Sequence, residues 1–242
     1  MSSMIPRWGW MGLALLAAAC DRKPALPRSE APPAPHEDSR ARIVFLGTSL
    51  TAGLGLDPSE AYPALLQQKI DSAGLPYVTI NAGVSGETSA GARRRIDWLM
   101  RQPAAVLVVE TGANDGLRGL DPDSLESNIQ AIIDRAREQS PPPRIILLGM
   151  RAPPNLGRSY DRRFQQVYAD LAKRNGVRLV PFLLQGVAGI DSLNQADGIH
   201  PTAAGQRKMA EGVWEVLRGV LRGVLSSYLK ASTTRSISPA VL

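Results

Sequence analysis

The hydrophobic pattern of residues 42–225 alternates between short apolar runs and longer segments with helical periodicity. The apolar runs are rich in valine and isoleucine and end at glycine or polar residues, which predicts strands. We expect strands at 42–47, 77–80, 105–109, 144–149 and 177–181. The amphipathic segments between and after them predict helices at 60–73, 89–101, 122–139, 160–175 and 202–225.

The expected strands are almost continuously apolar, which is typical of strands that are covered on both faces of a sheet. Strands that alternate with helices favour a parallel, doubly wound sheet. The sequence therefore predicts one α/β domain, and 242 residues suffice for its core. The last helix should bury one face, formed by Met209, Val213, Leu217 and Leu221.

The first twenty residues have the pattern of a signal peptide. Arg7 precedes an apolar run at 11–19 that is too short to span a bilayer, and Cys20 follows it. The pattern resembles a bacterial lipoprotein signal, in which the cysteine is lipidated, although Ala17 stands where leucine is usual. The alternative is an ordinary secretory signal cleaved near Ala19. We expect a periplasmic protein anchored to the membrane through Cys20, or otherwise a secreted one.

Two further segments are predicted to lie outside the folded domain. Residues 21–41 contain five prolines among charged residues and are expected to form a semi-extended linker. Residues 226–242 have few large apolar side chains at helical spacing and are expected to form a flexible tail.

Charge and cysteine content exclude several function classes. The formal net charge is +6, but the basic residues are scattered, so we expect no nucleic-acid partner. A single cysteine allows no internal disulfide and no cysteine-based metal site. Only two histidines are present, which argues against a histidine-rich metal centre, so we expect no metal.

The candidate chemistry lies immediately after the expected strands. Ser49 follows the first strand, Gly83 the second and Asn114 the third, while Asp197 and His200 precede the last helix. Each of these residues, taken alone, is common in turns, at helix caps or on the protein surface and does not indicate catalysis. The carboxyl ends of neighbouring parallel strands line one crevice, so these side chains can meet there.

The reaction that fits these residues is acyl transfer. A serine hydroxyl needs a base to act as a nucleophile, and His200 is the only histidine in the expected domain. Asp197 can bind the other ring nitrogen and fix its tautomer. Donors for the oxyanion are expected to be the backbone N–H groups of Ser49 and Gly83 and the side-chain amide of Asn114.

The same residues resemble the SGNH (GDSL-type) hydrolases, specifically the bacterial arylesterases, acyl thioesterases and lysophospholipases. The motifs that carry the resemblance are Gly47-Thr48-Ser49-Leu50, Asn81 to Thr88, Gly112-x-Asn114-Asp115, Met150 to Asn155 and Asp197-x-x-His200. The resemblance implies a flavodoxin-like three-layer α/β/α fold with a parallel five-stranded sheet and no metal or organic cofactor. It also suggests that Pro154 and Asn155 line the acyl pocket.

One residue departs from the family pattern. Thr48 replaces the aspartate that usually precedes the nucleophile. Threonine keeps a hydroxyl but loses the charge, so we expect activity with altered hydrogen bonds at the turn.

The sequence thus predicts a monomeric serine ester hydrolase that acts on small acyl esters or thioesters, with lysophospholipids among the candidates. A carbohydrate deacetylase of the same fold is one alternative. An inactive lipid-anchored binding protein is another.

Overall fold

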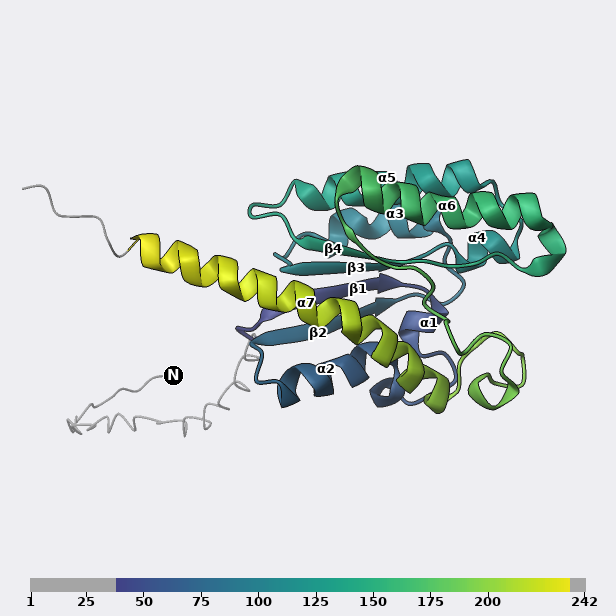
Figure 1. Ribbon diagram of the computed structural model, residues 1–242, viewed down its shortest axis with the longest axis horizontal. Coiled ribbons are helices and arrows are strands. Elements are labelled where there is room, and N and C mark those ends of the chain that lie inside the picture. Colours follow the sequence, from purple (N-terminus) through teal and green to yellow (C-terminus); the bar gives the residue numbers. More distant parts are fainter. Residues whose placement is uncertain (1–37, 236–242) are drawn as a thin grey trace, which may run out of the picture. The chain divides into compact units, whose positions relative to one another are not determined.

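The computed structural model describes residues 38–235, with side chains up to Val224. Its centre is a five-stranded sheet in which every neighbouring pair of strands is parallel (Figure 1). The strands are β1 (Ala41–Gly47), β2 (Tyr77–Gly83), β3 (Val106–Glu110), β4 (Arg144–Leu148) and β5 (Arg178–Val180). Their order across the sheet is β2-β1-β3-β4-β5, which confirms the predicted parallel, flavodoxin-like arrangement.

Helices cover both faces of the sheet and give three layers (Figure 1). On one face α3, α5 and α6 pack side by side, and on the other face α2 packs against α7. The helices are α1 (Ser49–Ala52), α2 (Tyr62–Ser72), α3 (Ser89–Leu99), α4 (Ala113–Leu117), α5 (Pro122–Arg137), α6 (Arg158–Asn175) and α7 (Ala203–Arg235). Residues 38–235 also contain three short 3₁₀ helices: η1 (Pro58–Glu60), η2 (Pro154–Leu156) and η3 (Asp191–Leu193).

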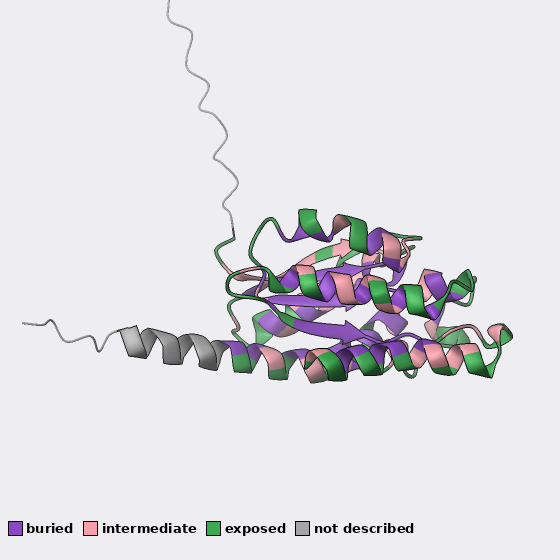
Figure 2. Ribbon diagram, turned by 90° about the horizontal axis from the view of Figure 1, so that it is seen from above, coloured by how far each residue is buried: buried purple, intermediate pink, exposed green. Residues whose placement is uncertain are grey.

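The buried residues follow the predicted pattern in the central strands and in the helices. Strands β1, β3 and β4 are buried along most of their length, and each outer helix has one buried and one exposed side (Figure 2). The edge strands β2 and β5 have one buried residue each, and β2 is otherwise mostly half-buried. The predicted inner face of α7 is confirmed, because Met209, Val213, Leu217 and Leu221 are all buried. Burial of these faces supplies the main favourable free energy of the fold.

Several element boundaries differ from the sequence-based expectation. Strand β2 continues to Gly83, because Asn81 uses its side-chain amide to bind the Thr51 carbonyl at 2.9 Å and a polar residue therefore fits there. Helices α1 and α4 have four and five residues, too few to show a period. Helix α7 runs to Arg235 rather than ending at residue 225, since 226–235 contains no glycine or proline to stop it. Part of the segment expected to be a flexible tail is therefore helical.

The topology explains why reactive residues gather at one edge of the sheet. The chain leaves β1 toward β2 on one side, and β3 then pairs with β1 on the other side. Ligands of open α/β sheets bind at such a switch point, outside the carboxyl ends of the strands. Helix α1 follows β1 at this edge, and α4 follows β3.

The predicted signal peptide, Cys20 and the linker up to Glu37 lie outside the described residues. Of the described helices, none combines the length and apolar character needed to cross a membrane.

Candidate active site

Ser49, the candidate nucleophile, lies directly after the turn between β1 and α1. Residues Ile43 to Leu46 are fully buried in the sheet, and Thr48 is the N-cap of the short helix that Ser49 begins. The first N–H groups of a helix have no acceptor within it, so the Ser49 N–H is available to a ligand. The Ser49 side chain reaches the cavity while the residue is only 9% exposed.

The loop before α7 supplies the base and its partner. His200 Nε2 lies 2.9 Å from Ser49 Oγ, and His200 Nδ1 lies 2.6 Å from Asp197 Oδ2. The N–H groups of Ile199 and His200 both donate to Asp197 Oδ1 at 3.0 Å. These hydrogen bonds, first of all the one from the His200 side chain, lower the pKa of Asp197 to about 2. The structure thus brings together the three predicted catalytic residues.

Two glutamines, Gln195 in this loop and Gln206 in α7, bind α1 and the residues that follow it. Gln195 Nε2 donates to the Leu54 carbonyl at 2.7 Å, and its backbone N–H donates to the His200 carbonyl at 2.7 Å. Gln206 Nε2 donates to the Leu50 carbonyl at 3.1 Å, while its Oε1 accepts from the Tyr62 N–H at 2.9 Å. The base and the nucleophile, 151 residues apart, are therefore held at a fixed distance.

The structure does not support Gly83 as an oxyanion donor. The Gly83 N–H donates to Asn81 Oδ1 at 3.0 Å, and Gly83 is not among the cavity residues. A Cβ at Gly83 would lie 2.3 Å from the Ala52 nitrogen. Glycine is needed at this position because the backbone of β2 packs directly against α1.

Of the two glycines at positions 83 and 86, Gly86 and not Gly83 lines the cavity, together with Ser49 and Asn114. The Glu87 N–H donates to the Val84 carbonyl at 3.2 Å, and Gly86 has a φ of 78°, which together are typical of a type II turn. The Gly86 N–H donates to no group in the described part of the chain. Asn114 Nδ2 donates to the Glu87 carbonyl at 3.0 Å and retains a second hydrogen.

The catalytic groups open into a cavity of about 790 Å³. Its walls are mostly apolar, with Leu50, Leu54, Leu117, Met150 and Ile199 among them. Pro154 lines the cavity as expected. Asn155 does not, because it is the next residue of the 3₁₀ turn and is exposed to solvent.

The sequence pattern of the GDSL-like lipase/acylhydrolase family matches residues 45–208, which include every catalytic group described above. The chain belongs to this family. It is 41% identical over 180 residues to the esterase TesA of Pseudomonas aeruginosa, covering 74% of this chain and 89% of that protein. It is 37% identical to the thioesterase 1/protease 1/lysophospholipase L1 of Escherichia coli K12, covering 70% and 79%. It is 33% identical to an arylesterase of Vibrio mimicus, covering 73% and 88%.

Solved structures of GDSL-type enzymes agree with these relatives. The crystal structure of TesA matches with a TM-score of 0.71 at 40% identity, covering 74% of this chain and 99% of that chain. The psychrotrophic esterase EstA from Pseudoalteromonas, inhibited by monoethylphosphonate, matches with a TM-score of 0.70 at 32% identity, covering 75% and 98%. The predicted fold and the predicted enzyme class, a carboxylic ester hydrolase, are confirmed.

This GDSL-type site also contains a buried carboxylate that the sequence analysis missed. Glu110, the last residue of β3, is fully buried beneath the nucleophile turn. A Cβ at Gly47 would lie 2.9 Å from Glu110 Oε2, so the turn rests directly on the carboxylate. Burial raises the pKa of Glu110, and hydrogen bonds from Thr48 and Thr51 offset part of that rise. The sequence feature that could have indicated this buried carboxylate is an acidic residue directly at the end of the apolar run 105–109.

A partly buried ion pair between Arg95 and Glu87 connects the turn at Gly86 to β1. Arg95 Nη2 lies 2.7 Å from Glu87 Oε2 and donates to the Gly47 carbonyl at 3.1 Å. Because Asn114 binds the Glu87 carbonyl, one arginine links the nucleophile turn with the residues around Gly86 and Asn114.

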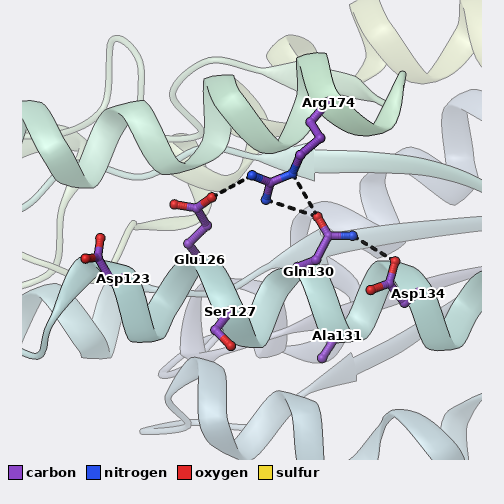
Figure 3. Close-up of a pocket in the computed structure, with 7 residues that line it drawn as sticks. All are labelled: Asp123, Glu126, Ser127, Gln130, Ala131, Asp134 and Arg174. Carbon is purple, nitrogen blue, oxygen red and sulfur yellow. Dashed lines mark hydrogen bonds and ion pairs between the residues drawn. The ribbon is translucent and has the colours of Figure 1, made fainter.

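Another pocket, of about 430 Å³, lies between α5 and α6 and shares no residue with the catalytic cavity (Figure 3). Two of its acidic side chains are ion-paired, since Arg174 binds Glu126 at 2.9 Å and Arg163 binds both Glu126 and Asp123. The third, Asp134, accepts a hydrogen bond from Gln130 at 2.8 Å. These contacts fasten two helices together and offer no reactive group. Within residues 38–235, no three His, Cys, Asp or Glu side chains gather to hold a metal ion.

Proposed function

We propose that the protein hydrolyses small acyl esters or thioesters through an acyl-enzyme formed on Ser49. The observation that carries this proposal is the unbroken line of hydrogen bonds from Asp197 through His200 to Ser49, which ends at the wall of an apolar cavity. Such a line activates a serine hydroxyl that is otherwise a weak nucleophile.

The first half of the reaction makes the acyl-enzyme. Ser49 Oγ bonds to the acyl carbon while its proton passes to His200 Nε2. Asp197 accepts a hydrogen bond from His200 Nδ1 and stabilises the resulting imidazolium. The tetrahedral oxyanion is bound by the N–H groups of Ser49 and Gly86 and the free amide hydrogen of Asn114. The bond to the alcohol or thiol then breaks, and His200 returns the proton to that leaving group.

The second half releases the acid. Water occupies the place of the leaving group and gives a proton to His200 as its oxygen bonds to the acyl carbon. The same three donors stabilise the second oxyanion. Collapse of this intermediate breaks the Ser49 ester, and His200 protonates Ser49 Oγ. The enzyme returns to its starting state with no metal or redox step.

The proposed substrate class rests on the walls of the cavity. Apolar side chains around the nucleophile favour an acyl chain over a sugar ring, which needs many hydrogen-bond partners. The names of the relatives, an esterase, an arylesterase and a thioesterase/lysophospholipase, agree with an acyl substrate. The intact contacts of Ser49 and His200 disfavour the inactive binding protein, whereas Thr48 was its only warning sign.

The proposal is tested by hydrolysis of p-nitrophenyl butyrate. The full chain should turn over this ester, and Ser49→Ala should abolish turnover. Ser72→Ala, an exposed serine of α2, is the matched control and should retain it. Asn114→Ala should lower kcat by roughly 10²-fold to 10³-fold if its amide binds the oxyanion. Equal turnover in Ser49→Ala and the unaltered protein would reject the proposal.

We further propose that the enzyme works as a monomer in the periplasm, anchored to the membrane through Cys20. The monomer is supported by a serine, a histidine and an aspartate that already contact one another within one chain, so the proposed reaction needs no residue of a second subunit. The location is supported by the sequence of residues 1–20. Cys20→Ser should abolish incorporation of radioactive palmitate in growing bacteria. Label that persists in this variant would reject the anchor.

A further inference from the structure

One side chain of the catalytic cavity differs in charge from all the others. In the described part of the chain, the lining residues include no aspartate or glutamate, and apart from the catalytic histidine the only cationic side chain is Arg151. Arg151 follows β4 and is exposed, so its guanidinium can meet both the cavity and solvent. The apolar walls and the single cation are therefore suited to two different parts of a substrate.

The position of this guanidinium is fixed by its surroundings. Arg151 Cζ lies 4.8 Å from the centre of the Phe182 ring, and Phe182 also lines the cavity. The backbone on either side is pinned: Gly149 accepts a hydrogen bond from the Leu183 N–H at 2.9 Å, and the Ala152 N–H donates to Asp161 Oδ1 at 3.2 Å. A cation held in place before the ligand arrives loses less entropy on binding.

The edge of the guanidinium remains available. The contact with the Phe182 ring is a cation–π interaction, which uses the charge of the guanidinium and occupies none of its N–H donors in a hydrogen bond to an oxygen. Arg151 forms no ion pair and donates no hydrogen bond to any residue of the described chain. The partly buried Arg95 and the helix-linking Arg163 and Arg174 are all paired with carboxylates. Arg151 is thus a preorganised, unneutralised cation in the wall of the catalytic cavity.

We propose that Arg151 binds a phosphate group carried by the leaving group of the substrate. The acyl chain is apolar and matches the cavity walls, whereas the leaving group must depart toward solvent, where Arg151 is exposed. The planar fork of arginine matches two phosphate oxygens. The net charge of +6 also favours approach of an anionic substrate. This inference rests on the proposed function and assigns Arg151 the role of selecting substrates with a phosphorylated leaving group over those with a neutral one.

The test compares matched pairs of substrates that differ in phosphate. The thioester pair is butyryl-coenzyme A and butyryl-N-acetylcysteamine, and the ester pair is a monoacylglycerol phosphate and the same monoacylglycerol. The variants are Arg151→Gln and Arg151→Lys. Arg158→Gln is the matched control, because Arg158 is an exposed arginine at the start of α6 that does not line the cavity.

Arg151→Gln should lower kcat/KM on a phosphorylated substrate by roughly tenfold, as expected for hydrogen bonds to a charged group, and change the neutral partner by less than about twofold. Arg151→Lys should fall between, since it keeps the charge without the fork. The effect should shrink as salt is added. A response confined to the thioester pair identifies a phosphorylated thiol, and one confined to the ester pair identifies a phosphoglycerol headgroup.

Two results overturn the inference. One is an equal change on phosphorylated and neutral substrates, and the other is an equal response of Arg158→Gln. Turnover of the neutral substrates checks that each variant is folded. For each substrate pair, the ratio of kcat/KM on the phosphorylated substrate to kcat/KM on the neutral one is compared between the variant and the unaltered protein. If neutral substrates are hydrolysed in a Ser49-dependent way while Arg151→Gln leaves this ratio unchanged for both pairs, the inference fails and the proposed function stands. If no substrate is hydrolysed by the unaltered protein, the proposed function itself fails.

Discussion

Thr48 donates to the buried carboxylate of Glu110 twice, from its backbone N–H at 2.7 Å and from its hydroxyl at 2.9 Å to the same oxygen. Thr51, in the first turn of α1, donates to that oxygen at 2.9 Å. The threonine that replaces the usual aspartate thus serves as a donor to a carboxylate supplied by another strand. Because Ser49 lies between these two threonines, Glu110 holds the turn that carries the nucleophile.

This arrangement predicts that Thr48 and Glu110 support catalysis by positioning Ser49. Thr48→Val leaves the carboxylate with one donor fewer and should cost about 1–3 kcal/mol of unfolding free energy. Displacing the turn should also lower kcat by roughly tenfold or more. Glu110→Gln should act similarly, and Thr48→Ser should restore activity. Steady-state kinetics with p-nitrophenyl butyrate and urea unfolding measure both effects, and KM should change little.

Tyr62→Phe separates positioning from general stability. The Tyr62 hydroxyl contacts Thr51 Oγ1 at 2.8 Å and is fully buried, but it belongs to the far end of the network. Its loss should cost about 0.5–1.5 kcal/mol of unfolding free energy without changing kcat. If Tyr62→Phe and Thr48→Val reduced kcat equally, the network would have only a structural role.

The proposed oxyanion donor is Gly86 instead of Gly83, and this assignment predicts which amide protons respond to a bound oxyanion. A phosphonate attached to Ser49 places a charged oxygen where the oxyanion forms. In ¹⁵N-labelled protein, the amide protons of Ser49 and Gly86 should move downfield on adduct formation. The Gly83 amide should remain near its original position, since it is bonded to Asn81. A large shift of Gly83 with none at Gly86 would restore the original assignment.

The lowered pKa of Asp197 predicts how the free energy of unfolding depends on pH in acid. Its pKa falls from 3.8 to about 2 on folding, so the folded state favours its ionised form. The resulting stabilisation is complete above about pH 4 and is lost as the pH falls through about 2. Urea unfolding at a series of pH values should show a smaller acid-induced loss for Asp197→Asn than for the unaltered protein. Parallel curves for the two proteins would contradict the assigned pKa.

The fold could be predicted because strands and helices leave local patterns in the sequence. The triad could be predicted because its residues follow or precede these elements in a definite order along the chain. Continuous apolar runs mark the strands, and the period of α7 marks the buried face with Met209 and Val213. Ser49, Asp197 and His200 each follow or precede a predicted element, and the topology of a parallel sheet brings such positions together.

The remaining features depend on the direction in which a backbone N–H or a side chain points, and on contacts between residues that are distant in the sequence. Gly83 and Gly86 both follow β2, and only the hydrogen bond of Asn81 and the turn at Gly86 decide which N–H faces the cavity. Glu110 extends an apolar strand, and its partners at 48 and 51 come from another strand and its helix. Asn155 differs from Pro154 by one step around a 3₁₀ turn, which no sequence pattern reports.

The most direct test of the account is covalent labelling of Ser49. The full chain is incubated with a fluorophosphonate, digested and analysed by mass spectrometry. We expect one phosphonate per chain, on the peptide that contains Ser49, and a rate of labelling that falls strongly in His200→Ala, because the hydroxyl loses its base. Labelling of another residue, or no labelling of folded protein that hydrolyses esters, would contradict Ser49 as the nucleophile.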